Sequence, residues 1–363
     1  MIGSHISDIK WMKRAIHLAS LGKGRTSPNP MVGAVILDKN GNLISEGFHS
    51  KSGMPHAEAM AFNNLNKDAR GGTIYVNLEP CCHQGKTPPC VDKIISFGIK
   101  KVFVSTEDPD KRVSGKGIKL LKNAGIKVHL GLCKKESQEL NKSFIHRNVT
   151  DNVFGVMKWA MSMDGRVGLK NGNSKWITNK DSRSLVHCHR ADFDAIIIGG
   201  NTLRKDNPIL TSRGMRNPEP LRVVFTKTLD LPQKSNLWAC DSAKTLVVYD
   251  SSTANKKFLK RIPECVEIVE LPSDNPKLLS NLLAKKNCNN ALWECGPKLA
   301  TSAIKAGCIQ ELMTFIAPKI LGGESSMNPF SDFKFTDMDE VFNLNKSEIK
   351  FIGNDIFVKS TIY

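Results

Sequence analysis

Residues 56–62 and 79–90 hold the side chains with the clearest chemistry. The first stretch reads HAEAMAF. The second reads EPCCHQGKTPPC and places three cysteines and a histidine in twelve residues. Thiolate and imidazole groups are ligands that zinc prefers, and a catalytic zinc ion uses three protein ligands and keeps a fourth position for water. Together the two stretches predict a zinc site.

The order of these residues follows the zinc deaminase pattern, in which His-x-Glu precedes Pro-Cys and a second cysteine. His56 and Glu58 form the first part, and Cys81 follows a proline. The common spacing would put the second thiol at position 84, which is Gln here, so Cys90 is the next thiol able to start a helix. We expect His56, Cys81 and Cys90 to bind the metal. Glu58 is expected to be the catalytic residue that carries protons rather than a ligand.

Two neighbours of these residues have other expected roles. Cys82 is expected to point away from the metal, and His83 is a candidate substrate contact. Taken singly, a cysteine or histidine of this kind is more often a structural residue. A closed structural zinc site would need four ligands, whereas this stretch offers three and an acid–base carboxylate. The combination therefore favours an enzyme over a structural zinc module.

The composition of the chain indicates its number of domains, its cellular location and its classes of partner. The chain has 363 residues, 40% of them hydrophobic and 24% charged, which suits two soluble α/β domains. Its ten cysteines are scattered, and no apolar run approaches a membrane span of about 18 residues, so we expect a cytoplasmic protein. The net charge of +17 has three interpretations: a nucleic-acid partner, phosphorylated small molecules, or a basic background.

Strands and helices alternate along both halves of the chain, which predicts a three-layer α/β/α domain followed by a second α/β domain. A hairpin is expected over 29–49 and helices over 1–20, 54–65, 88–98, 115–125 and 134–152. Strands are expected over 71–80, 100–108, 126–132, 153–162, 191–200, 220–226, 245–250, 289–296 and 311–321. We expect the domains to be residues 1–147 and 148–363.

The sequence resembles the RibD family of bifunctional riboflavin-biosynthesis proteins over nearly its whole length. Residues 27–36, 56–62 and 78–90 resemble the deaminase half, and residues 157–168, 174–178, 204–213 and 293–300 resemble the reductase half. The resemblance implies a cytidine-deaminase-like domain and a dihydrofolate-reductase-like domain, which form a homodimer. It also implies zinc-dependent deamination of a phosphorylated diaminopyrimidine and then NADPH-dependent reduction of its ribosyl group, with Zn²⁺ and NADPH as cofactors.

In the deaminase half, the resemblance draws attention to Asn29 and Lys86. Asn29 is either a turn residue of the SPNP stretch or an amide that pairs with a pyrimidine edge. Lys86 and His83 flank the metal stretch and could meet a phosphate, although a solvated loop lysine is the more frequent case.

The reductase half has no G-x-G-x-x-G after its first strand. Residues 289–307 instead read as a strand, a Gly-Pro turn and a helix, whose first backbone N–H groups would face an anion. The resemblance supports a role for this turn in binding NADPH. We expect the binding residues to be Gly296, Pro297, Lys298, Leu299, Ala300, Thr301 and Ser302. Thr202 and Asp206 follow a diglycine, lie one helical turn apart and face the same side.

The remaining roles come from the family. It implies that Thr202, Asp206, Ala160 and Trp176 contact the cofactor. It places substrate contacts at Lys158, Ser174, Arg190, Leu210, Arg213 and Glu294. Arg190 and Arg213 could each form a bidentate pair with the ribose phosphate, and Lys158 is a candidate partner of the ring oxygen.

Two positions depart from the family pattern. Asn207 stands where the family has a second aspartate, and Thr226-Lys227 replaces Asp-Ser. Lys227 could meet the 2′-phosphate of NADPH or be solvated. The alternative function is a zinc deaminase acting on a nucleobase or nucleic acid, with a non-catalytic C-terminal domain.

Overall fold

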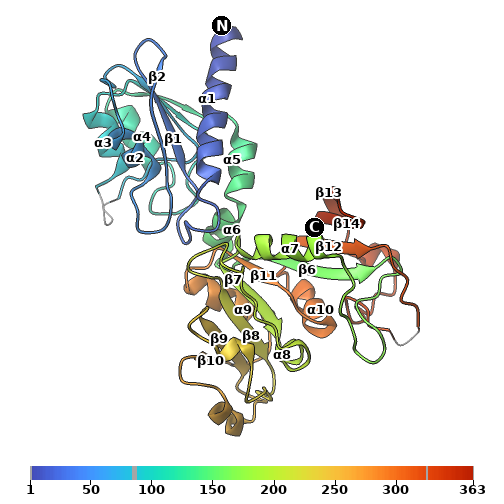
Figure 1. The fold of residues 1–363 in the computed structure, drawn as a ribbon. Coiled ribbons are helices and arrows are strands. Elements are labelled where there is room, and N and C mark those ends of the chain that lie inside the picture. The colour runs from blue at the N-terminus through green and yellow to red at the C-terminus, as the bar shows by residue number, and fades with distance from the viewer. Residues whose placement is uncertain (1, 84–87, 324–325, 363) are drawn as a thin grey trace. The chain divides into compact units, whose positions relative to one another are not determined.

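The computed structural model describes residues 2–83, 88–323 and 326–362 and divides the chain into two compact units, residues 1–150 and 151–363. Figure 1 shows both units as ribbons. Within the described residues, no helix is long and apolar enough to cross a membrane. Both units are mixed α/β folds, as predicted.

The first unit contains five strands and six helices among its described residues. The strands are β1 (Gly33–Leu37), β2 (Leu43–Phe48), β3 (Thr73–Val76), β4 (Lys101–Val104) and β5 (Lys127–Leu130). The helices are α1 (Ile2–Ser20), α2 (Ala57–Asn63), α3 (Cys90–Ser96), α4 (Lys116–Asn123), α5 (Lys134–Leu140) and α6 (Lys142–Thr150). The sheet order is β2-β1-β3-β4-β5, with β1 antiparallel to both neighbours and β3, β4 and β5 parallel.

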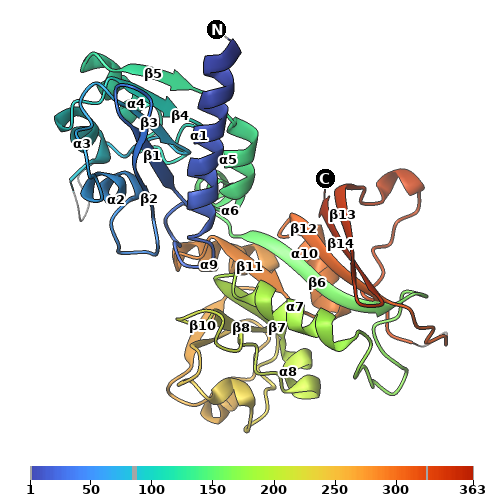
Figure 2. The same ribbon diagram turned by 45° about the horizontal axis from the view of Figure 1, so that its top comes forward.

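Alternating side chains give this sheet two apolar faces. Ala34 and Ile36 of β1 pack with α2, α3 and α4, whereas Val35 and Leu37 pack with α1. Helices α1 and α5 cover one face and α2, α3 and α4 the other (Figure 2). Gly33 permits the close approach of α1, because a Cβ there would lie 2.1 Å from the Ala15 carbonyl oxygen. The predicted three-layer arrangement is confirmed.

The hairpin between β1 and β2 forms for the expected reason. Asp38 Oδ1 accepts hydrogen bonds from the amides of Asn40, at 2.8 Å, and Asn42, at 2.9 Å, and Gly41 adopts a φ of 86°. The helix expected over 134–152 is instead two helices, α5 and α6, which meet at Asn141. The Asn141 side chain bonds both backbone groups of Met31, its Oδ1 accepting and its Nδ2 donating, each at 2.8 Å.

The second unit is built on one nine-stranded sheet in the order β10-β9-β8-β7-β11-β6-β12-β14-β13. Its strands are β6 (Phe154–Ser162), β7 (Ala195–Gly199), β8 (Leu221–Thr226), β9 (Thr245–Asp250), β10 (Glu267–Leu271), β11 (Asn290–Trp293), β12 (Glu311–Ala317), β13 (Leu344–Ile352) and β14 (Asp355–Ile362). Its helices are α7 (Lys180–Arg190), α8 (Gly200–Asp206), α9 (Pro276–Lys285) and α10 (Pro297–Lys305), with 3₁₀ turns η1 (Asn236–Trp238), η2 (Lys256–Arg261) and η3 (Met338–Glu340).

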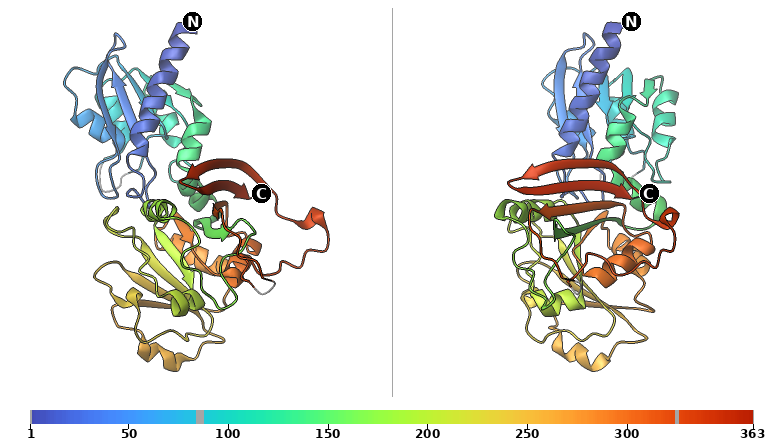
Figure 3. Two further views of the ribbon diagram at one scale, coloured as in Figure 1. Left: turned by 45° about the vertical axis from the view of Figure 1, so that its right-hand side comes forward. Right: turned by 90° about the vertical axis from the view of Figure 1, so that its right-hand side faces the viewer.

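Seven of these strands are parallel, and the β13–β14 hairpin runs antiparallel at the end of the sheet (Figure 3). Ile196 and Ile198 of β7 pack on the face that carries α7 and α8, and Ile197 packs on the face that carries α9 and α10. Strands β10, β13 and β14 were not predicted from the sequence. Because these seven strands are parallel, their carboxyl ends lie at one edge of the sheet.

Candidate active sites

The three expected metal ligands lie together in the first unit. His56 stands directly before α2, Cys81 follows β3, and Cys90 opens α3. His56 Nδ1 lies 3.5 Å from each sulfur. In the described part of the chain these residues form a group whose ligand atoms all lie within 4.8 Å of one another. One nitrogen and two sulfur donors with an open fourth position suit a catalytic zinc ion.

Backbone contacts between the two cysteine segments hold this cluster in place. The Cys90 amide donates to Cys81 Sγ at 3.4 Å, and the Val91 amide donates to the Cys81 carbonyl at 3.2 Å. Hydrogen bonds from Cys90 and His56 lower the pKa of Cys81 to about 4. Cys82 packs against the core on the α2–α3–α4 face, where burial raises the pKa of its thiol. Its side chain is therefore outside the cluster.

Glu58 is the second residue of α2 and lies beside the same cluster. Its side chain is buried, with 3% exposure. Burial raises the pKa of Glu58 to about 7, and the negative charge of Cys81 adds to the effect. A carboxyl group whose pKa lies near neutrality can both accept and release a proton during turnover. Glu58 thus has the environment of a general acid–base residue.

Asn29 is brought to this site by a histidine that the sequence reasoning missed. His49, which follows β2, is buried, and its ring lies edge-on to His56 at 5.7 Å. His49 Nδ1 lies 3.1 Å from the Pro55 carbonyl oxygen, which can only accept, so Nδ1 is assigned the proton and Nε2 accepts from Asn29 Nδ2 at 3.1 Å. Among the described residues, the Asn29 side-chain oxygen has no hydrogen-bond partner and remains for a ligand. A histidine seven residues before His56, at the end of a predicted hairpin, was the available signal.

The other two expected substrate contacts of this unit are His83 and Lys86. His83 Nδ1 is buried and has no hydrogen-bond partner among the described residues. A buried polar atom of this kind favours a ligand that supplies the partner. Lys86 lies outside the described residues.

In the second unit, three of the expected substrate residues form one ion cluster, in which their side chains are 9–19% exposed. Lys158 on β6 and Arg190 at the end of α7 both contact Glu294, which directly follows β11. The Glu294 oxygens lie 3.0 Å from Lys158 Nζ and 2.7 and 3.2 Å from two Arg190 nitrogens. Burial raises the pKa of Glu294, but the positive charges of Arg190 and Lys158 outweigh it and hold that pKa well below its usual range. The cluster presents a carboxylate and two fixed cations.

Most of the expected cofactor residues follow two adjacent strands, β7 and β11, whereas Ala160 is on β6 and Trp176 is in the loop after it. Gly296 directly precedes α10, and Gly199 directly precedes α8. A Cβ on Gly296 would lie 3.9 Å from Thr202 Oγ1, and one on Gly199 would lie 3.6 Å from Leu299 Cδ2. The two glycine turns therefore face each other at the carboxyl edge of the sheet, where an α/β fold binds dinucleotides. This cradle fits NADPH.

Not every residue of the 296–302 stretch offers its side chain to a ligand. Ala300 packs in the core, and Thr301 Oγ1 exchanges hydrogen bonds with the Ser331 backbone at 3.2 and 2.9 Å. Lys298 and Ser302 are exposed. At the start of α10, the groups available to a cofactor are therefore the backbone amides and the side chains of the exposed residues.

Asp206 lies near the loop that contains Ser174 and Trp176. Burial raises the pKa of Asp206, while Lys175, on that loop, and Lys205 oppose the shift. Trp176 is 63% exposed, and the Arg183 guanidinium lies over its ring, 4.3 Å from the centroid. An exposed indole held by a cation is available to cover a flat ligand. Ser174 is half-buried in the same loop.

Leu210, Arg213 and Ala160 differ in how far they are exposed. Leu210 is 2% exposed and part of the core, which leaves its backbone as the group able to meet a ligand. Arg213 is exposed. Burial lowers the pKa of His187, and the positive charges of Arg190 and Arg213 lower it further. Ala160 lies on β6 opposite Phe315 and packs against the core. Of the two arginines expected to bind phosphate, Arg213 is exposed, whereas Arg190 is bound to Glu294.

The structure shows the surroundings of both departures from the family pattern. Asn207 directly follows α8 with a φ of 40°. Asparagine tolerates this left-handed conformation better than most residues other than glycine. Its Oδ1 accepts from the Asn236 amide at 2.8 Å and from Ser235 Oγ at 3.0 Å. Lys227 Nζ lies 3.4 Å from an Asp274 oxygen, and both side chains are exposed.

Both units are similar to known proteins. Residues 6–106 match the cytidine and deoxycytidylate deaminase zinc-binding region, and residues 153–358 match the RibD C-terminal domain. The riboflavin biosynthesis protein RibD of Synechocystis is 42% identical over 96% of this chain and 95% of its own. The chain belongs to the RibD family. The RibD of Aquifex aeolicus is 38% identical over 97% of each chain.

Solved RibD structures share the fold over the full length. The structure of Acinetobacter baumannii RibD has a TM-score of 0.89 and 33% identity, with 99% of each chain covered. A Thermotoga maritima structure, titled as a diaminohydroxyphosphoribosylaminopyrimidine deaminase and 5-amino-6-(5-phosphoribosylamino)uracil reductase, has a TM-score of 0.87 and covers 99% of this chain. The likeness extends through both units, so the alternative of a nucleic-acid deaminase with an idle second domain is not favoured.

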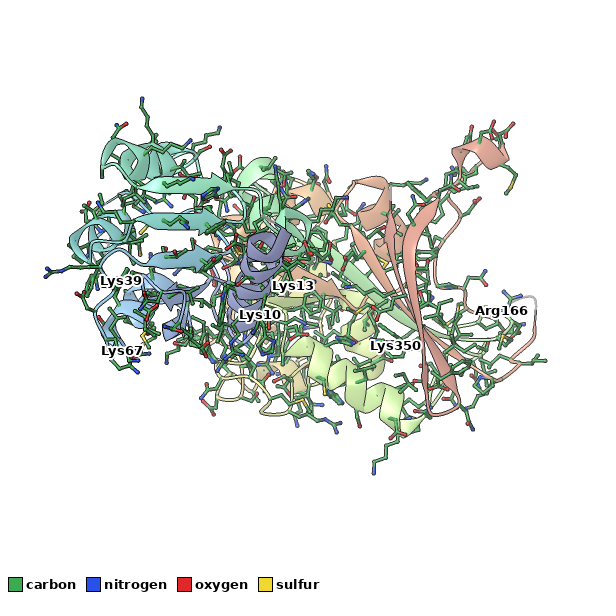
Figure 4. All side chains as sticks on the ribbon, turned by 90° about the horizontal axis from the view of Figure 1, so that it is seen from above. Lys10, Lys13, Lys39, Lys67, Arg166 and Lys350 are labelled. Atoms are coloured by element: carbon green, nitrogen blue, oxygen red, sulfur yellow. The ribbon has the colours of Figure 1, made fainter. Side chains whose placement is uncertain are left out.

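The distribution of charge agrees with this choice. Figure 4 labels cations that lie on both units rather than in one patch, namely Lys10, Lys13, Lys39, Lys67, Arg166 and Lys350. A nucleic-acid groove needs basic side chains gathered along one track. The labelled cations of this RibD-family protein come from both of its units.

Proposed function

We propose that this chain catalyses two consecutive reactions of riboflavin biosynthesis at two separate sites. Residues 1–147 deaminate 2,5-diamino-6-(5-phosphoribosylamino)pyrimidin-4(3H)-one, and residues 148–363 reduce the resulting 5-amino-6-(5-phosphoribosylamino)uracil to its ribitylamino product. One observation carries the proposal: a three-ligand metal cluster with a buried carboxyl group and a separate dinucleotide cradle with a buried ion cluster lie on one chain. The family supplies the substrates.

The residues around the metal cluster divide the work of deamination. His56, Cys81 and Cys90 would hold zinc, which when bound makes water acidic enough to react near neutral pH. Glu58 takes a proton from the attacking water and returns it to the leaving amine, a contribution of about 10²–10⁴ in rate. His49 orients Asn29 so that its free side-chain oxygen can accept from the pyrimidine. His83 and Lys86 are the proposed contacts to the remainder of the substrate.

Reduction uses the groups at the carboxyl edge of the second sheet. NADPH supplies the reducing equivalent when bound. Thr202, Asp206 and residues 296–302 would hold it, with Ala160 and Trp176 on its nicotinamide side. These residues orient the cofactor, and orientation is the protein's main contribution to such a reaction.

The ion cluster and its neighbours position the sugar. Glu294 keeps the Lys158 ammonium fixed, so that this cation can stabilise negative charge on the ribose ring oxygen as the ring opens. Arg213 is free to bind the phosphate, and Arg190 orients Glu294 from the other side. The Leu210 backbone and Ser174 complete the proposed substrate contacts.

We also propose that the protein is a cytoplasmic homodimer that associates through its second unit. Strand β13 is the edge of the nine-stranded sheet, and Ile349 and Phe351 on it are exposed, the latter by 76%. An exposed apolar edge strand favours pairing with another chain. Light scattering of the purified protein should give twice the chain mass, and Phe351→Lys should shift it toward the monomer.

The function is tested with the purified, zinc-loaded full chain. Given the diaminopyrimidine phosphate and NADPH, it should release ammonia and oxidise NADPH in equal amounts. Given the deaminated intermediate, it should oxidise NADPH and release no ammonia. Ammonia release with no NADPH oxidation from either substrate would show that the second unit is silent, and no ammonia from the first substrate would overturn the deaminase assignment.

A further inference from the structure

Two cysteines outside both proposed sites lie in contact. Cys240 follows η1 and Cys265 precedes β10, and their sulfur atoms are 2.7 Å apart although the residues are 25 positions apart in the chain. Both are free thiols. Two thiols that meet from separate segments can be joined without a large backbone movement.

A buried arginine organises the segment that carries Cys240. Arg222 on β8 is fully buried, and its Nη2 donates to the carbonyls of Leu237, Ala239 and Ala243 at 3.1, 3.0 and 2.6 Å. These bonds wrap the 237–243 turn around the guanidinium. The same cation acts electrostatically on both Cys240 and Cys265. The thiolate is the reactive form of cysteine.

The two thiols differ in exposure. Cys265 is exposed, whereas Cys240 is half-buried. Burial and the hydrogen bond with Cys265 raise the pKa of Cys240 to about 11, so Cys240 retains its proton at neutral pH. Cys265 is therefore the sulfur that a dissolved oxidant meets first, with Cys240 in position to react second.

We propose that Cys240 and Cys265 form a modification site that hydrogen peroxide oxidises to a reversible disulfide. The Cys265 thiolate attacks one peroxide oxygen, the O–O bond breaks, and the hydroxide released takes up a proton to leave as water, which gives a sulfenic acid. The Cys240 thiol then attacks the Cys265 sulfur, the S–O bond breaks, and a second water leaves with the Cys240 proton. The two thiols lose two electrons in total, and the peroxide gains them.

The disulfide would restrain a segment that supports the cofactor cradle. Ser235 and Asn236, at the start of this segment, both donate to Asn207, which ends the α8 helix that carries Thr202 and Asp206. Joining Cys240 to Cys265 closes a loop of about 25 residues, which stabilises the folded state mainly by restricting the unfolded chain. We expect the second unit to unfold about 5 °C higher after oxidation.

The test uses the zinc-loaded full chain at neutral pH, treated with hydrogen peroxide, alkylated, and digested without reductant. Mass spectrometry should find a peptide pair joined through Cys240 and Cys265, which dithiothreitol separates. The matched control is Cys188→Ser, which removes another exposed thiol and should leave the joined peptides unchanged. In Cys240→Ser, a sulfenic acid should instead accumulate at Cys265, where dimedone traps it.

Unfolding followed by tryptophan fluorescence gives a second readout. The peroxide-treated chain should unfold about 5 °C above the reduced chain, in the wild type and in Cys188→Ser but not in Cys240→Ser. Recovery of both Cys240 and Cys265 as separately alkylated peptides after Cys188 has been oxidised would overturn the proposal. So would a Cys240–Cys265 disulfide that forms no faster than random pairs of the other exposed thiols.

Discussion

Glu294 and Arg190 lie 104 positions apart in the sequence and form a bidentate ion pair inside the second unit, with Nε to Oε1 at 2.7 Å and Nη2 to Oε2 at 3.2 Å. Lys158 contacts the same carboxylate at 3.0 Å. The register of the sheet explains the meeting, because Trp293 on β11 pairs with Met157 on β6, so the next residues along both strands are neighbours. The proposed reductase site is therefore assembled around one carboxylate that is 9% exposed.

Replacing Glu294 by Gln should destabilise the second unit. The change leaves two buried cations without their counter-charge, and breaking a buried pair in this way costs about 3 kcal/mol in the free energy of unfolding. Urea unfolding followed by tryptophan fluorescence measures it, since four of the five tryptophans lie in the second unit. The control is Glu348→Gln, which removes the exposed pair with Lys350 and should cost less than about 1 kcal/mol. Equal effects would contradict the buried-cluster interpretation.

The same carboxylate predicts a pH dependence of stability. The pKa of Glu294 is lowered in the folded state, so its contribution is complete above the unfolded value of about 4.3 and is lost as the pH falls through the folded pKa. The difference in unfolding free energy between the wild type and Glu294→Gln should stay constant from pH 8 to about pH 5 and shrink below about pH 4. A difference that already shrinks between pH 7 and pH 6 would indicate a raised pKa instead.

Zinc content should separate the two neighbouring cysteines. Cys90→Ala removes one of three donors and should leave the purified chain with little zinc, whereas Cys82→Ala should keep about one zinc ion per chain. Metal analysis after dialysis measures both. Loss of zinc from Cys82→Ala together with its retention in Cys90→Ala would show that the ligand assignment is wrong.

Asn29 should affect substrate binding and not the metal. If its free side-chain oxygen accepts from the pyrimidine, Asn29→Ala should lower kcat/KM for deamination by about 10-fold, equivalent to one lost hydrogen bond of about 1.4 kcal/mol. Zinc content should not change. Asn42→Ala, in the β1–β2 turn, serves as the control and should leave kcat/KM within twofold. If Asn29→Ala also leaves kcat/KM unchanged, Asn29 is a turn residue only.

The arrangement of His56, Cys81 and Cys90 could be predicted because each ligand follows a local signal. His56 precedes a helical pattern, Cys81 follows an apolar strand, and Cys90 comes after two prolines that open a helix. Local signals of this kind depend on neighbours in the chain. His49 was missed because its role depends on Pro55 and Asn29, which reach it only through tertiary structure.

The edge strands of the second unit could not be predicted in the same way. Strand β10 reads EIVEL and is partly exposed along its whole length, so it lacks the continuous apolar run of its buried neighbours. Strand β13 carries charged residues beside exposed apolar ones, and its pairing with β14 decides its structure. Both are edge strands of the sheet, where partial burial leaves no clear hydrophobic pattern in the sequence.

The Lys158–Glu294–Arg190 cluster shows a further limit of the sequence. Each residue was expected to meet the substrate on its own, because the family pattern gives positions and not contacts. The structure places the three in one network, in which Arg190 is also a partner of Glu294. The register of β6 and β11 brings Lys158 to Glu294, and the packing of α7 brings Arg190, so the network is visible only once the unit is assembled.

The central claim, that two sites on one chain act in order, is tested most directly with Glu58→Gln supplied with each substrate in turn. Given the deaminated intermediate, this variant should retain its zinc and oxidise NADPH at the wild-type rate. Given the diaminopyrimidine phosphate, it should release ammonia at least about 100-fold more slowly and oxidise NADPH no faster than it releases ammonia. Ammonia release at the wild-type rate, or rapid NADPH oxidation with the diaminopyrimidine, would contradict the account.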